Sequence, residues 1–97
     1  MTALLGTDAV PEGGGVVLRE HRIVVTQPSP GEFVAFDATC THRACLVRSV
    51  AGGTISCFCH GSRFRITDGS VAGGPAPEPL PRRAITVVDG TIHLDGA

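Results

Sequence analysis

The chain of 97 residues contains no Trp, no Tyr and only four Phe. With so few large aromatic side chains, its hydrophobic core must be thin. A domain of this length buries only about 60–65% of the surface that the unfolded chain exposes. A covalent or metal cross-link would stabilise such a fold. That structural use of the four cysteines has to be weighed against any chemistry they perform.

The chain also lacks a strong net charge and a long apolar run. Its formal net charge is −1, which provides no electrostatic basis for binding nucleic acid or an anionic membrane. No apolar stretch approaches the ~20 residues that a membrane-spanning helix needs. The first residues lack the charged start and apolar centre of a signal peptide. We therefore expect no nucleic-acid partner and no direct membrane span in this chain.

Helical periodicity is missing as well, because the apolar residues alternate or form short runs that predict β-strands. Turn signals, including Asp89-Gly90 as a type I′ turn, separate the strands that we expect at 16–18, 23–27, 32–37, 46–50, 54–56, 64–67, 70–72, 84–88 and 91–94. The proline-rich run 73–81 cannot be a central strand and is expected to be a stiff connection. Short strands at this spacing predict a single all-β domain, an antiparallel β-sandwich or small barrel.

Two short stretches hold all four cysteines and two of the four histidines: Cys40-Thr41-His42-Arg43-Ala44-Cys45 and Cys57-Phe58-Cys59-His60-Gly61-Ser62. A structural zinc site needs four ligands, usually in two close pairs. Such a site would leave two of the six donors without a use. Two disulfides would use the cysteines but leave both histidines idle.

A [2Fe-2S] cluster with mixed ligands accounts for all six residues. In such a centre two cysteines hold one iron and two histidines hold the other. Each stretch can supply one Cys and one His, namely Cys40 with His42 and Cys57 with His60. Cys45 and Cys59 then remain, close enough in sequence to be bridged. A zinc-stabilised interaction module with no redox role stays open as an alternative.

These two stretches resemble the Cys-Thr-His-x-x-Cys and Cys-x-Cys-His-Gly-Ser boxes of the Rieske iron–sulfur protein family, with fourteen residues between His42 and Cys57. A third segment, residues 74–77, is similar to the proline loop that shields the cluster in that family. The order and spacing of all three segments agree, and with the strand-rich flanks the resemblance covers nearly the whole chain.

The resemblance implies a fold and a set of site residues. We expect stacked antiparallel sheets over residues 1–97, with a cluster-binding subdomain at about 38–81 and a base formed by 1–37 and 82–97. Cys45 and Cys59 are expected to form the disulfide of the higher-potential branch of the family, and Ser62 to donate a hydrogen bond to a bridging sulfide. The predicted ligands are Cys40, His42, Cys57 and His60, and the predicted shielding loop is Gly74, Pro75, Ala76 and Pro77.

Four residues depart from the pattern of the higher-potential members. Phe64 stands where they carry a tyrosine whose hydroxyl bonds a ligand sulfur, and Phe58 stands where they carry a proline. Arg43 and Ala44 replace a Leu-Gly pair, of which the leucine helps to form a quinol-docking surface. We therefore expect a potential above that of Rieske ferredoxins but below that of the bc-complex proteins.

The function implied is one-electron transfer through a Rieske [2Fe-2S] cluster, by a soluble carrier or the soluble domain of an electron-transfer complex. The alternatives are a quinol-oxidising subunit of a cytochrome bc-type complex and the ferredoxin of a ring-hydroxylating oxygenase. We expect redox partner proteins, such as a cytochrome or a quinol-linked membrane complex. No catalytic residues are predicted, and no turnover by the chain alone is expected. A structural disulfide favours an extracytoplasmic location, as part of an exported protein, over a cytoplasmic one.

Overall fold

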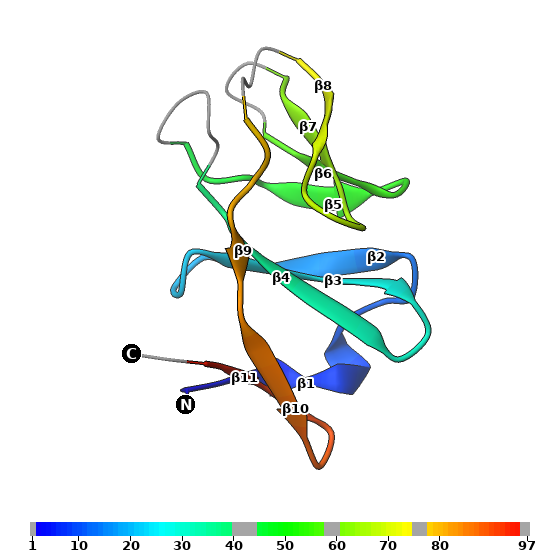
Figure 1. Ribbon diagram of the computed structural model, residues 1–97, viewed down its shortest axis with the longest axis vertical. Helices are drawn as coiled ribbons and strands as arrows, with labels where there is room; N and C mark the ends of the chain where they lie inside the picture. Colours follow the sequence, from blue (N-terminus) through cyan, green and yellow to red (C-terminus); the bar gives the residue numbers. More distant parts are fainter. Residues whose placement is uncertain (1, 40–44, 58–60, 75–77, 96–97) are drawn as a thin grey trace.

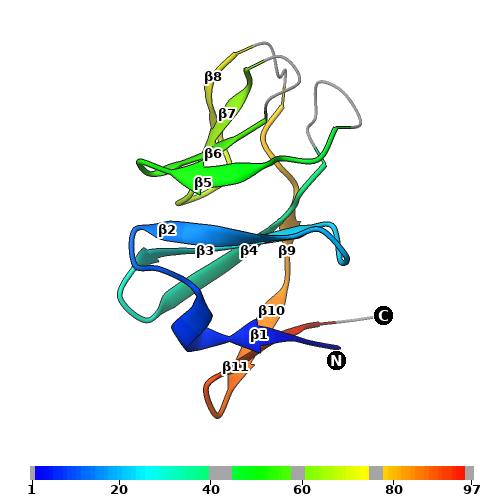
Figure 2. The same ribbon diagram turned by 180° about the vertical axis from the view of Figure 1, so that it is seen from behind.

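A computed structural model describes residues 2–39, 45–57, 61–74 and 78–95. These residues form three antiparallel sheets stacked as layers, which Figure 1 and Figure 2 show from opposite sides. A single 3-10 turn, η1 (Thr7–Ala9), follows the first strand, and the described residues contain no α-helix. The predicted all-β, antiparallel class is confirmed. The described residues also contain no helix with the length and hydropathy needed to span a bilayer.

The lowest layer in Figure 1 contains the strands in the order β1-β11-β10. Strands β10 (Ile85–Val88) and β11 (Thr91–Leu94) form the predicted hairpin. Asp89 and Gly90 at its tip have φ of 50° and 76°, which confirms the predicted type I′ turn. Strand β1 (Thr2–Gly6) pairs with β11 and was not predicted.

The middle layer has the order β2-β3-β4-β9. Strands β2 (Gly14–Leu18), β3 (Ile23–Ser29) and β4 (Glu32–Asp37) match the prediction closely. Strand β9 (Arg82–Arg83) adds to β4 and leads directly into β10, so it joins the middle and lowest layers.

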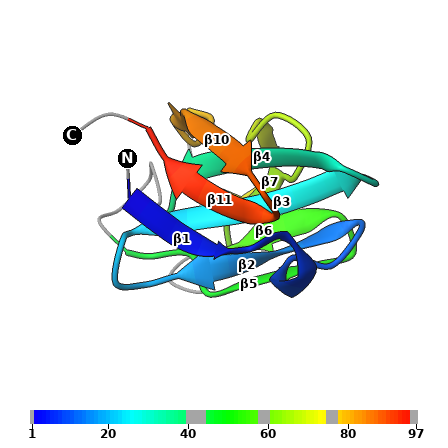
Figure 3. The ribbon, with the colours of Figure 1, turned by 90° about the horizontal axis from the view of Figure 1, so that it is seen from below.

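The third layer, called the upper lobe here, has the order β5-β6-β7-β8. It is formed by β5 (Ser49–Ala51), β6 (Thr54–Ser56), β7 (Arg63–Arg65) and β8 (Val71–Gly73). All four strands fall within the range predicted for the cluster-binding subdomain. The view from below in Figure 3 shows the lowest layer in front of the other two.

Two groups of buried apolar residues hold the layers together. One includes Phe36, Ile55 and Phe64, and joins the middle sheet to the upper lobe. The other includes Ile23, Val25 and Ile92, and joins the middle sheet to the lowest one. The buried Thr26 hydroxyl on β3 also donates a hydrogen bond of 2.8 Å to the carbonyl of Ile66. The upper lobe is therefore fixed to the middle sheet by packing and by a buried polar contact.

Candidate functional site

The second Cys/His box lies at the tip of the β6–β7 hairpin. Cys57 directly follows β6 and Ser62 directly precedes β7. The Cys57 backbone N–H donates to the Ser62 carbonyl at 2.8 Å, which closes the ladder below the tip. Cys57 and Ser62 are almost fully buried, with 1% and 0% of their surface exposed. The strand register thus holds a buried sulfur beside a buried hydroxyl-bearing residue.

The Ser62 hydroxyl is the most informative atom of this site. Its Oγ is buried, and it has no hydrogen-bond partner within the part of the chain that the structure describes. An unpaired buried hydroxyl costs about 1–3 kcal/mol, so such an atom calls for an explanation. A cluster sulfide would accept a hydrogen bond from this hydroxyl. The residue therefore fits the role that the family resemblance implies.

The first Cys/His box begins where the chain leaves the middle sheet. Thr39 forms an isolated antiparallel bridge with Leu46, and the Val47 N–H donates to the Ala38 carbonyl at 2.8 Å. These contacts hold the two ends of the box together. Cys45 is disulfide-bonded. Its predicted partner, Cys59, lies outside the described residues, so the Cys45–Cys59 pairing stays a prediction.

The two boxes meet the same part of the core. Cys57 belongs to the buried group that joins the upper lobe to the middle sheet, and Cys45 packs against that group. The Arg48 N–H donates to the Ser56 carbonyl at 2.9 Å, which links the segment after the first box to the strand before the second. Sequence-distant boxes are thereby brought to one end of the lobe.

The start of the predicted shielding loop contacts the second box. Gly74 has a φ of +87°, and a Cβ at this position would lie 2.5 Å from the Ser62 Cα. Only glycine allows an approach this close. Pro75, Ala76 and Pro77 lie outside the described residues.

Phe64 occupies the predicted tuning position on β7 and is fully buried. It belongs to the same buried group as Cys57. Its ring carries no donor, so it contributes packing and no hydrogen bond.

Three predicted ligands, Cys40, His42 and His60, lie outside the described residues. Within the described ranges no group of three or more His, Cys, Asp or Glu side chains could hold a metal ion. The ligand set therefore stays a prediction. The parts of the site that are described, a buried cysteine and an unpaired buried hydroxyl next to a glycine, fit a [2Fe-2S] cluster.

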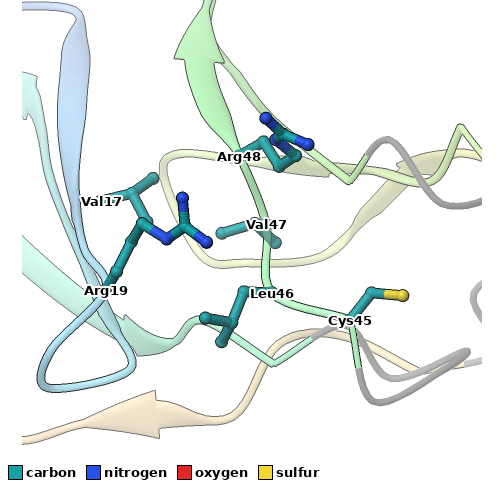
Figure 4. A pocket seen from close by; sticks show the side chains of 6 residues that line it. All are labelled: Val17, Arg19, Cys45, Leu46, Val47 and Arg48. Carbon is teal, nitrogen blue, oxygen red and sulfur yellow. The ribbon is translucent and has the colours of Figure 1, made fainter.

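Sequence reasoning missed a surface cavity beside Cys45, which Figure 4 shows from close by. Its walls come from β2 and its hairpin on one side and from residues 45–48 on the other. Because these segments are far apart in sequence, no local pattern could reveal the cavity.

Comparison with known proteins agrees with this reading of the site. The Rieske [2Fe-2S] domain family matches residues 2–86. The cytochrome b6-f complex iron-sulfur subunit of Chlorobaculum tepidum is 35% identical over 86 residues, which cover 86% of this chain and 46% of that protein. The putative respiratory nitrate reductase Rieske subunit of Haloferax mediterranei is 40% identical over 66% of this chain and 30% of that protein. The chain thus spans about half or less of the length of these relatives.

Solved structures share the whole fold. The cyanobacterial plasma membrane Rieske protein from Synechocystis PCC 6803 superposes with a TM-score of 0.78 and 28% identity. The match covers 99% of this chain and 100% of the Synechocystis chain. A ferredoxin from Sphingomonas yanoikuyae B1 superposes with a TM-score of 0.77 and 25% identity, over 98% and 97% of the two chains. The chain therefore belongs to the Rieske [2Fe-2S] domain family, binds the iron–sulfur cluster of that family and serves one-electron transfer.

Proposed function

We propose that this chain is the electron-transfer domain of a disulfide-containing Rieske protein on the extracytoplasmic side of a membrane. The observation that carries the proposal is the disulfide at Cys45. Structural disulfides persist in oxidising compartments and are rare in the cytosol. Within the family that the boxes resemble, the ferredoxins and oxygenase domains lack this second cysteine pair.

The residues of the chain would perform four tasks in this function. Cys40 and Cys57 would hold one iron, and His42 and His60 the other. The bound cluster supplies the redox step by accepting and returning one electron. Ser62 would donate a hydrogen bond from its hydroxyl to a sulfide. This bond would raise the reduction potential, because a donor stabilises the added negative charge. Cys45 would tie the first box to the second through its disulfide.

We also propose that the partner is a redox protein of a membrane-linked complex. Matched relatives include a subunit of a cytochrome b6-f complex and a nitrate reductase subunit. These names support a membrane-linked oxidoreductase complex as donor or acceptor. Arg43 in the first box argues against direct quinol oxidation, because the resemblance implies a leucine of the quinol-docking surface at this position and the chain has a charged residue there.

A second candidate, a ferredoxin that serves a ring-hydroxylating oxygenase, is supported by the similarity to the Sphingomonas ferredoxin. The Cys45 disulfide separates the two candidates. If the thiols of the native protein were all reduced after purification without reductant, the ferredoxin assignment would be preferred.

The decisive experiment is a redox titration of the purified protein at several pH values, together with iron and sulfide analysis. Rieske potentials range from about −150 to about +300 mV. We expect a value between those of the ferredoxins and those of the bc-complex proteins, and a fall with rising pH. The fall is expected because ligand histidines hold their protons more tightly when the cluster is reduced.

Two outcomes would contradict the proposal. A potential that stays flat from about pH 6 to about pH 10 would exclude ligand histidines whose protons couple to the electron. A colourless protein with zinc in place of iron and sulfide would support the zinc-stabilised module. The location can be tested separately by mass spectrometry of the full-length native protein, which shows whether an export signal or an anchor accompanies this domain.

A further inference from the structure

The cavity beside Cys45 has a volume of about 400 Å³. We call it the Arg19 pocket, and it is lined by Val17, Arg19, Cys45, Leu46, Val47 and Arg48. Figure 4 shows Val17 and Arg19 on one wall, Leu46, Val47 and Arg48 on the facing wall, and Cys45 at one end. The segment 45–48 directly continues the first Cys/His box, so the pocket adjoins the functional site.

The lining combines an apolar floor with two cations. Val47 is buried, and Val17 and Leu46 are half-buried against the core of the upper lobe. Arg19 and Arg48 are both exposed. The Arg19 side chain makes no hydrogen bond or ion pair within the described part of the chain, so its donors are available to a ligand. The Arg19 pocket can therefore take a group that is anionic at one end and aliphatic next to it.

A carboxylate is the anion that fits this arrangement best. A guanidinium offers paired N–H donors that match a carboxylate. An aspartate or glutamate flanked by aliphatic residues would place its charge against Arg19, near Arg48, and its neighbours on Val17 and Leu46. A charge-assisted hydrogen bond of this kind is worth more than a neutral one.

The distribution of charge along the chain favours an acidic protein as the source of that carboxylate. Residues 38–81 contain four arginines and two acids, whereas the rest of the chain contains four arginines and seven acids. The cluster-bearing part is thus positive and the base is negative. Such an asymmetry orients an acidic partner toward the positive end and speeds its association.

We propose that the Arg19 pocket is a docking site for an acidic side chain of the redox partner protein. This inference rests on the proposed function and adds the partner's chemistry to it. A carboxylate seated in the pocket would hold the partner next to the first Cys/His box, which supplies two of the four predicted cluster ligands. The apolar floor would remove water from one side of the ion pair and so strengthen it.

The test uses the purified protein with its cluster and a short peptide as the probe. Acetyl-Leu-Asp-Leu-amide is titrated into the protein at low ionic strength in a calorimeter, and acetyl-Leu-Asn-Leu-amide is the uncharged control. The variant Arg19→Glu reverses the charge in the pocket. The matched variant Arg82→Glu makes the same change of net charge on β9, which lines a different cavity.

We expect saturable binding of the aspartyl peptide. Replacing its carboxylate by the amide, or introducing Arg19→Glu, should weaken binding about tenfold or more. Arg82→Glu should leave the affinity within about twofold. The proposal is overturned if the wild type shows no saturable binding, if both peptides bind equally, or if the two variants lose affinity equally.

The visible spectrum is recorded for every variant, so that loss of the docking site can be distinguished from loss of the cluster. A wild-type protein without iron and sulfide would count against the proposed function, because that function requires a bound cluster. The peptide titration reports on the Arg19 pocket itself. A red-brown protein that fails to bind the peptide would therefore overturn only the docking site.

Discussion

Gly74 lies directly against Ser62, so that a Cβ on residue 74 would come within 2.5 Å of the Ser62 Cα. The first residue of the predicted shielding loop thus packs on the backbone of the second Cys/His box. The close contact requires a residue without a side chain. It ties the position of the loop to that of the buried hydroxyl beside Cys57.

The first prediction follows from this contact. Gly74→Ala should destabilise the protein and speed loss of the cluster on heating, because the loop must move away from Ser62. Gly31→Ala is the control, since Gly31 has a similar φ of +81° and no atom within 4 Å of an added Cβ. The control should cost only the backbone strain, about 1–2 kcal/mol. Equal thermal bleaching of the visible absorption in the two variants would show that the contact has no role.

The second prediction concerns the unpaired hydroxyl. Ser62→Ala should lower the reduction potential by about 20–60 mV, the equivalent of one lost hydrogen bond. Protein-film voltammetry measures this shift directly. Ser70→Ala is the control, because the Ser70 hydroxyl accepts a bond from Arg65 at an exposed turn. An unchanged potential in Ser62→Ala would leave the buried hydroxyl without a role in tuning.

The third prediction adds a donor where the chain has none. Phe64→Tyr should raise the potential by a similar amount, because its hydroxyl would reach a ligand sulfur. If the hydroxyl found no acceptor, the buried site would instead lose about 1–3 kcal/mol of stability and the potential would stay constant. Phe33→Tyr is the matched change at a half-buried position outside this core. It should affect neither quantity.

The fourth prediction tests the link between the layers. Thr26→Val preserves the shape of the side chain but removes the 2.8 Å bond to the Ile66 carbonyl. The free energy of unfolding should fall by about 1–3 kcal/mol, because a buried carbonyl loses its donor. Thr54→Val removes an exposed bond to the Ala51 carbonyl and should change stability by less than about 0.5 kcal/mol. Chemical denaturation of both variants provides the comparison.

The fifth prediction identifies the partner of Cys45. Peptide mapping without reductant should recover Cys45 joined to Cys59, and a Cys40–Cys45 peptide would refute the assigned roles. The double variant Cys45→Ser with Cys59→Ser should lose about 3 kcal/mol of stability, because the bridge closes a loop of about 15 residues. The visible spectrum should persist at low temperature, since neither residue is a predicted ligand.

Local signals allowed much of the fold to be predicted. The Asp89-Gly90 turn and the alternating residues of β4 depend on neighbours in sequence, and both were predicted correctly. Strand β1 was missed because its only partner in the described sheet, β11, lies at the other end of the chain. No turn signal joins the two, so only the assembled sheet reveals the pairing.

The strand predicted at 46–50 was too long for a related reason. Val47 donates to Ala38 in the direction of the middle sheet, whereas Arg48 donates to Ser56 in the upper lobe. The segment changes partner at this point, and β5 begins only at Ser49. Apolar periodicity shows that a segment is extended but does not show which sheet it joins.

The candidate site likewise combines local features that the sequence predicted with packing between segments that it did not predict. The boxes predicted that Cys57 and Ser62 would be functional, because spacing within a hairpin tip is local. Burial of the Ser62 hydroxyl without a partner, and the cavity formed by Val17 and Leu46, depend on how separate segments pack. Packing of this kind cannot be obtained from one sequence pattern.

The pairing of β1 with β11 has a practical consequence for how the protein can be handled. Thr2 pairs with Leu94, so both ends of the chain leave the molecule together from the lowest layer, opposite the upper lobe (Figure 1 and Figure 2). A tag or linker at either end therefore leaves the upper lobe unobstructed. Tethered to a solid support through one of these ends, the molecule would present the upper lobe to proteins in solution.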